Sequence, residues 1–507
     1  MSHHLITLML LLPFIGAVFQ AFLPQTDKEG SKSLGRATAI ASSLAGSICG
    51  LLLVVGMQPQ SSELQALEVL PWIGSFSISY RMAVDGLNVL PVLLIAILFP
   101  VLIAAEWDQK IGRRGMHGLL LVLQTSLAGA VCAQDLFLLF FFWAMSSLPL
   151  YFLIGVWGGP QRETAAFRSM VAAAVGNALF FAALVLIYYS IEPHTFSLSE
   201  LSGGKLSKQT FQILGTDLSV AAVAFGMISL GLALRAPIWP LHGWFIEVAE
   251  EAPPSVFVAI SAVCVPVATY IFVRLTCSLF PETMASAAEG VVWVGGLNLV
   301  IGGICAVSQR RLKVLLAYVC LSEVGLILIG MGSLSAAGMV GAVYQQLALG
   351  LGVAGFGLLS GVLMGRTGVG EFRTEAGDPV LGGAATHAPM MALVAGVVVV
   401  SLLGFPGSGG FVGHSLLMIG SFSVHPGAVL LGCASLLLAT YYLFTLYRFV
   451  FLGPEASPRA KAIQDLTLRE QAYLYPLVIL LVVFGIYPKP LLELVRPTVL
   501  ALLGSIQ

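Results

Sequence analysis

Long apolar runs recur along almost the entire chain, and this feature restricts the possible folds more than any other. Runs of 18 or more residues can cross about 30 Å of hydrocarbon as helices. We count about fourteen, at 5–24, 35–57, 86–106, 117–134, 136–157, 166–190, 215–236, 254–279, 288–306, 312–332, 338–364, 388–421, 427–451 and 473–494. Among 507 residues only 24 are basic and 25 acidic, far below the roughly 25% charged residues of soluble domains. We therefore predict an all-α, polytopic protein of the lipid bilayer with about fourteen transmembrane helices.

Several function classes lack support in this composition. A net charge of −1 provides no basic surface for nucleic acid. The seven cysteines lie scattered in apolar runs without a C-x-x-C pair, so we interpret them as small core residues. The sequence contains no glycine-rich nucleotide loop and no H-E-x-x-H metal motif. The polar connections are too short for a catalytic domain, so we expect no cofactor or metal on this chain and any redox group on a partner.

The basic residues are distributed unevenly between alternate connections. Seventeen of the 24 lysines and arginines lie in or beside connections that follow odd-numbered runs, six lie on the other side, and Arg235 lies inside a run. Because basic residues are retained on the cytoplasmic side of short loops, we expect both termini on the non-cytoplasmic side of the cell membrane. One connection departs from this pattern, because 247–251 is acidic.

Two predicted spans are interrupted by proline or glycine, at 234–242 and at 404–410. Paired interruptions in corresponding positions indicate an internal repeat whose unwound backbone lines a polar site, although simple kinks are an alternative. Each interruption falls in the fourth member of a five-helix set, and the two sets would be inverted. We predict three N-terminal helices in 1–116, a first repeat in 117–283, a second in 284–452 and a last helix in 453–507.

Ionisable groups at membrane depth cost at least about 2.5 kcal/mol and commonly line a proton or ion path. Arg235 directly precedes the first interruption. It is a candidate functional residue; the alternatives are that it stabilises the break structurally or that its side chain snorkels to the cytoplasmic interface. Glu323 lies twelve residues beyond Arg311, about 18 Å along a helix and close to the bilayer midplane. It is a candidate for proton loading, and the alternative is a neutral glutamic acid that joins two helices.

Two histidines accompany the interruptions. His242 lies inside the first and His414 follows the second; each is a candidate proton carrier or a buried histidine that satisfies loosened backbone. By contrast, Glu106 and Asp135 lie at the ends of runs, and we expect them to be solvated or at the interface.

The interrupted spans and their flanking segments resemble the antiporter-like membrane subunits of respiratory complex I. The similar segments are 84–87, 135–159, 235–253, 312–322 and 404–413, which occur in the family's order. The subunit M type (NADH dehydrogenase subunit 4) fits best, because the chain stops soon after the fourteenth run. The resemblance implies a proton-conducting membrane-arm subunit that lies beside other membrane-arm subunits and is energised by quinone reduction elsewhere in the complex.

Several positions depart from the family's line of titratable groups. The resemblance places a glutamate at Ala144, a lysine at Arg235 and another lysine at Pro266. It places histidines at Glu323 and Leu349, and an acidic residue at His414. Since arginine does not deprotonate in a working cycle, the first repeat lacks the family's relay, whereas the second keeps two titratable groups.

Three hypotheses follow. The leading one is a proton-translocating subunit in which Arg235 is a fixed charge, His242 is a further candidate, and Glu323 and His414 exchange protons. The second is a structural paralogue that does not pump. The third is a subunit of a multisubunit Na⁺/H⁺ antiporter or of a membrane-bound hydrogenase. In the leading hypothesis, quinone and NADH or ferredoxin react on partner subunits.

Overall fold

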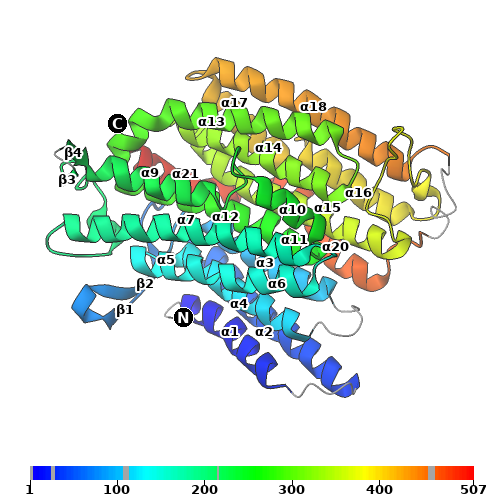
Figure 1. Ribbon diagram of the computed structural model, residues 1–507, viewed down its shortest axis with the longest axis horizontal. Coiled ribbons are helices and arrows are strands. Elements are labelled where there is room, and N and C mark those ends of the chain that lie inside the picture. The colour runs from blue at the N-terminus through cyan, green and yellow to red at the C-terminus, as the bar shows by residue number, and fades with distance from the viewer. Residues whose placement is uncertain (1–3, 24–28, 107–113, 214–215, 455–462, 507) are drawn as a thin grey trace.

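The computed structural model describes residues 4–23, 29–106, 114–213, 216–454 and 463–506. Within these ranges helices dominate, and most run side by side across the molecule (Figure 1). Eleven of them are long and apolar enough to cross a membrane, and shorter apolar helices lie among them. The prediction of an all-α polytopic membrane protein is therefore confirmed as a fold class. The division into inverted repeats stays a prediction.

The first half of the chain contains helices at each predicted run. They are α1 (Leu5–Phe22), α2 (Glu29–Gly56), α3 (Val89–Ala105), α4 (Arg114–Cys132), α5 (Leu136–Met145), α6 (Ser147–Trp157), α7 (Arg162–Ser190), α8 (Leu198–Leu201), α9 (Val220–Ala233), α10 (Gly243–Glu251), α11 (Pro254–Val258), a π-helical stretch (Ala259–Cys264) and α12 (Val265–Leu279). The first predicted interruption separates α9 from α10.

The second half continues the same pattern. Its helices are α13 (Pro281–Ser308), α14 (Leu312–Gly332), α15 (Ala336–Thr367), α16 (Pro389–Leu402), α17 (Gly409–Phe422), α18 (Pro426–Phe451), α20 (Leu468–Ile486) and α21 (Lys489–Gly504). The second predicted interruption separates α16 from α17. The run predicted at 473–494 is not continuous, because the chain leaves α20 at Tyr487 and begins α21 after Pro488.

Two β-hairpins that were not predicted occur between the helices, and the last of their strands occupies the start of the apolar run predicted at 215–236. Strands β1 (Gln65–Ile73) and β2 (Ile78–Val84) form one antiparallel pair, and β3 (Thr210–Ile213) and β4 (Thr216–Ser219) form the other. Both hairpins lie at the same end of the helical bundle, and the start of α1 and the end of α21 lie toward that end (Figure 1).

A few helices, nearly all of whose residues are buried, form the interior of the bundle. The segment α11–α12 and helices α14 and α15 are almost entirely buried, whereas α1, α7 and α20 expose much of their apolar surface. Exposed apolar side chains suit helices that face lipid. The titratable candidates Glu323 and His414 lie on the buried side of this arrangement.

A buried ion pair fixes the hairpin end of the bundle. Arg274 of α12 donates to the carboxylate of Asp85, just before α3, and its second terminal nitrogen donates to Oε1 of Gln134 at 2.8 Å. Both charged residues are buried. A buried charge pair is tolerated when further hydrogen bonds satisfy it, so this contact joins α12 to the segment before α3 and to the connection between α4 and α5.

Two carboxylates that were expected to be solvated are buried instead. Asp135 is fully buried and accepts from the backbone N–H of Leu138, which caps α5, and from the N–H of Ser79. Burial raises the pKa of this carboxyl. Glu106 is also buried and accepts from the hydroxyl of Ser255. The expectation was wrong because it considered position in the sequence alone, whereas neighbouring helices cover both helix ends.

The acidic connection that departed from the charge pattern is explained by ion pairs. Glu247 pairs with Arg168, and Glu250 pairs with Arg311 at 2.9 Å. The carboxylate of Glu251 accepts from the backbone N–H of Gln161. These acidic groups therefore lie among the basic residues of one face, so the connection 247–251 belongs to the same side as the basic loops.

Candidate functional site

The two titratable candidates of the second half meet in the protein interior. Nε2 of His414, on α17, lies 3.1 Å and 3.0 Å from the two carboxylate oxygens of Glu323, on α14. Glu323 is 8% exposed and His414 is 3% exposed, so water competes little for this contact. The sequence placed both residues at membrane depth, and the fold brings them into direct hydrogen-bonding contact.

A third polar side chain completes this cluster. Nε2 of Gln345, on α15, lies 2.8 Å from Oε2 of Glu323 and 2.9 Å from Nε2 of His414. Gln345 is itself buried. We call these three residues, Glu323, Gln345 and His414, the interior triad. Sequence analysis missed Gln345, although a glutamine inside an apolar run is a signal of the same kind as the charged residues.

The interior triad has two hydrogen-bonding arrangements. A single ring nitrogen carries either one lone pair or one proton, so Nε2 of His414 engages one partner at a time. When that nitrogen is unprotonated, the two N–H groups of Gln345 can donate to Glu323 and to His414 together. When a proton lies on the shared contact, it joins Glu323 to His414 and displaces Gln345 from the histidine. Addition of one proton therefore changes which hydrogen bond is made.

The histidine ring is held by the second helix break. Gly404 has a φ of +66°, a left-handed conformation, and a Cβ atom at this position would overlap Nδ1 of His414. That nitrogen is buried and has no hydrogen-bond partner among the described residues. The interruption between α16 and α17 thus shapes the space around the ring, because only glycine leaves room for it.

Arg235 lies at a separate position, at the end of α9. Its guanidinium donates to the backbone oxygen of Trp143 and to Oγ of Ser146, both at 2.8 Å, and lies 3.8 Å above the Trp143 ring. The residue is buried, and within the described part of the chain no carboxylate forms an ion pair with it. Arg235 is therefore a buried positive charge that is stabilised by neutral acceptors and an aromatic face.

His242 is not part of the interior triad. It precedes α10, and its ring lies edge-on to Tyr318 with a centroid distance of 6.3 Å. Its Nδ1 is buried without a hydrogen-bond partner among the described residues. The other end of α10, its C-terminus, is capped by Lys313, whose ammonium donates to the backbone oxygens of Glu250 at 3.0 Å and Ala252 at 2.7 Å. A cation at a helix C-terminus stabilises the unpaired carbonyls there.

Two of the positions that depart from the relay expected from the family carry apolar residues. Pro266 lies in the first turn of α12 after the π-helical stretch, and Leu349 is buried in α15. Of the seven cysteines, all of which are described, five are buried and none forms a disulfide. No group of three or more potential metal-binding side chains occurs among the residues that the structure describes.

The fold is that of a polytopic membrane protein with two broken helices, the class expected of the antiporter-like subunits. A family model described as NADH:quinone oxidoreductase/Mrp antiporter matches residues 133–439. The chain therefore belongs to this family.

Relatives extend this likeness over nearly the whole chain. NADH-quinone oxidoreductase subunit M of Escherichia coli K12 is 31% identical over 435 residues, which cover 84% of this chain and 82% of the relative. Subunit M of Rhodobacter capsulatus is 27% identical over 98% of this chain and 96% of its own length. The resemblance to subunit M is thus confirmed.

Solved structures show the same fold. A chain of respiratory complex I from Thermus thermophilus with bound NADH matches with a TM-score of 0.87 and 24% identity, over 99% of this chain and 100% of its own length. The Mrp complex from a Dietzia species matches with a TM-score of 0.83 at 18% identity, over 98% and 97%. At these identities the likeness concerns the fold alone.

Proposed function

We propose that this chain is a proton-translocating membrane-arm subunit of a complex I-type oxidoreductase. The observation that carries the proposal is the interior triad, in which a buried carboxylate and a buried histidine lie at 3.0 Å with a glutamine that bonds either of them. Histidine changes its protonation near physiological pH, and Glu323 supplies a second site for the same proton. The relatives named subunit M of NADH-quinone oxidoreductases support this assignment.

In this proposal the two halves of the chain have different roles. Glu323 and His414 load and release the proton, with Gln345 stabilising the unprotonated state. Arg235 keeps its charge throughout, because a guanidinium does not deprotonate in the working range, so it acts as a fixed positive charge in the first half. His242 is a further proton-path candidate near the first break.

The electron-transfer chemistry is assigned to partner subunits. NADH or ferredoxin and quinone would react there, and this chain would contribute proton transport without a redox site of its own. We further propose that the basic face is cytoplasmic and that both termini lie on the opposite side, because seventeen of the 24 basic residues lie in or beside one set of connections.

The test is proton pumping by the assembled complex in vesicles. Glu323→Gln and His414→Ala should each lower the number of protons moved per electron at least twofold, while quinone reduction and assembly persist. A normal ratio in both variants would contradict the proposal and favour a structural subunit that does not pump. Proton uptake that follows a sodium gradient without quinone reduction would instead support the antiporter hypothesis.

A further inference from the structure

Asn298 of α13 connects the first helix break to the helix that carries Glu323. It is completely buried. Its side-chain oxygen accepts from the backbone N–H of Trp239 at 2.8 Å, and its side-chain nitrogen donates to the backbone oxygens of Pro237 at 3.2 Å and Leu321 at 2.7 Å. One amide thus uses its acceptor and both donors on backbone groups of two different elements.

The break depends on this side chain for its backbone polar groups. Residues 234–242 separate α9 from α10, and the two prolines in this segment have no N–H to donate. The side chain of Asn298 accepts a hydrogen bond from the N–H of Trp239 and donates one to the carbonyl of Pro237, so both backbone groups of the break have a partner. A buried backbone group without a partner costs about 1–3 kcal/mol, so the conformation of the break is tied to the position of Asn298.

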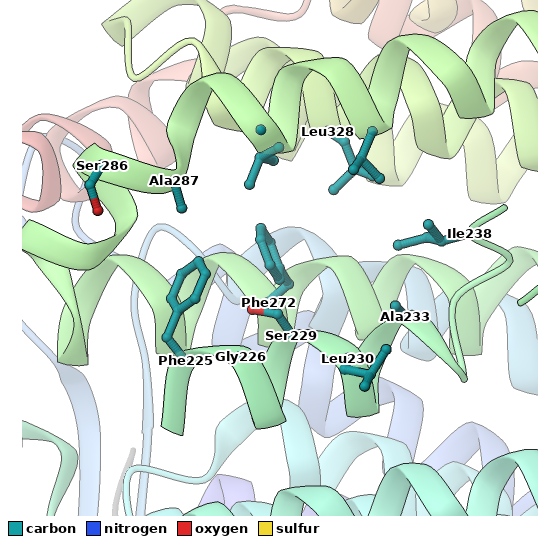
Figure 2. A pocket seen from close by; sticks show the side chains of 13 residues that line it. Phe225, Gly226, Ser229, Leu230, Ala233, Ile238, Phe272, Ser286, Ala287 and Leu328 are labelled. Atoms are coloured by element: carbon teal, nitrogen blue, oxygen red, sulfur yellow. The ribbon is translucent and has the colours of Figure 1, made fainter. Parts of the chain in front are cut away.

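Free space lies beside the same break. Ile238 points into a cavity of about 510 Å³ whose other walls come from α9, α12, α13 and α14 (Figure 2). Ala233 and Leu328 lie near Ile238, whereas Ser286 and Ala287 lie toward the other end of the cavity (Figure 2). The break is therefore held by hydrogen bonds to Asn298 and also borders a cavity into which Ile238 can shift.

Helices α13 and α14 pack so closely that a shift of one of them would move the other. A Cβ atom at Gly325 of α14 would overlap the backbone of α13 at Gly295 and Leu299, which shows how closely the two helices approach. Ser322 of α14 also donates to the backbone oxygen of Leu299 at 3.2 Å. Closely packed elements resist deformation, so a force applied at Asn298 reaches the turn of α14 that contains Leu321 and, two residues later, Glu323.

We infer that Asn298 is a positioning residue that couples the first helix break to the interior triad. A movement of Pro237 and Trp239 shifts Asn298, and with it the Leu321–Glu323 turn, so that the Glu323–His414 contact strengthens or weakens. Arg235, next to the break, thereby influences the second half of the chain without carrying a proton. This inference rests on the proposed function, since it gives Asn298 control over the geometry of the interior triad.

The test compares Asn298→Ala with Asn88→Ala in the assembled complex. Asn88 is a matched control, because it is also completely buried and bonds backbone oxygens, those of Ala83 and Val131, but it contacts neither the break nor the interior triad. We expect Asn298→Ala to lower the protons moved per electron at least twofold and to shift the pH profile of pumping. Asn88→Ala should leave both unchanged at a similar loss of thermal stability.

A double variant separates coupling from a general structural role. In a Glu323→Gln background, Asn298→Ala should lower the ratio no further, because it acts through Glu323. A further, additive decrease, or an equal effect of Asn88→Ala, would overturn the inference. A normal ratio in Asn298→Ala alongside a low ratio in Glu323→Gln would also overturn it and leave the proposed function intact.

Hydrogen exchange provides a readout that does not depend on pumping. In Asn298→Ala, amides of 236–242 and of 319–326 should both exchange faster than in Asn88→Ala. If Glu323→Gln and His414→Ala pump normally, the proposed function fails, and this exchange result alone decides whether the mechanical link exists. Faster exchange at the break with unchanged exchange in 319–326 would show that no link exists.

Discussion

Nε2 of His414 lies 3.0 Å from Oε2 of Glu323, although 91 positions separate the two residues in the chain. The first residue follows a helix break and the second lies in an unbroken helix at the centre of the bundle. A contact between a carboxylate and an imidazole in a buried site is strong when one proton is shared and unfavourable when the proton is lost.

Replacement of Gln345 by leucine should reduce proton transport. Without its N–H groups, the unprotonated state of the interior triad loses two donors, and a buried carboxylate that loses a donor is destabilised by about 1–3 kcal/mol. We expect the protons moved per electron to fall at least twofold. The control is Gln124→Leu, because Gln124 is also buried and bonds Ser43 and Ser47 on α2. Equal ratios in the two variants would contradict the role of Gln345.

Gly404→Ala should displace the His414 ring. The added methyl group would overlap Nδ1 of His414, and alanine also strains a backbone with φ of +66°. Gly407→Ala is a matched control, since its φ is +89° but nothing lies within 4 Å of an added Cβ. Proton pumping should fall in Gly404→Ala well below its value in Gly407→Ala. Similar pumping in both would mean that backbone strain alone accounts for the effect.

Arg235→Lys should reduce stability more than proton transport. Lysine keeps the charge but cannot form the two-nitrogen contact with Trp143 and Ser146, so we expect a loss of about 1–3 kcal/mol. Thermal unfolding of the purified complex measures this loss. Arg168→Lys, at a pair that is largely exposed on the arginine side, should change stability by less than about 0.5 kcal/mol. Lost pumping with unchanged stability would refute the fixed-charge role of Arg235.

Filling the cavity beside the first break should restrain that break. Ala233 lies close to Ile238, and Ala287 lies toward the opposite end of the same cavity (Figure 2). Ala233→Leu should therefore lower the ratio of protons to electrons, because it occupies the room into which Ile238 can shift. Ala287→Leu adds the same volume away from Ile238 and should leave the ratio unchanged. A normal ratio in both would argue against movement of the break into this cavity.

The sequence was a good guide to local features. Apolar runs and breaks are encoded within short segments, so the helices around 234–242 and 404–410 could be predicted directly, and Glu323 and His414, which lie within or beside such runs, are buried. The strands were not predicted. In β2, Ile78, Tyr80, Met82 and Val84 do alternate with other residues, which is the pattern of a strand, whereas β3 and β4 have four residues each and are too short to show a clear period. Predictions about solvation failed at Asp135 and Glu106, where distant segments cover a helix end.

Taken alone, the sequence determined that the chain belongs in a membrane and where its helices break, and it singled out Glu323 and His414 as ionisable groups within or beside apolar runs, because polar groups are costly in hydrocarbon. Only the tertiary structure decided which groups meet. It joined Glu323, Gln345 and His414 from three helices, left Arg235 without a carboxylate partner among the described residues, and placed Asn298 between the first break and α14. These side-chain contacts depend on how helices that are far apart in the sequence pack together, which no local sequence pattern encodes.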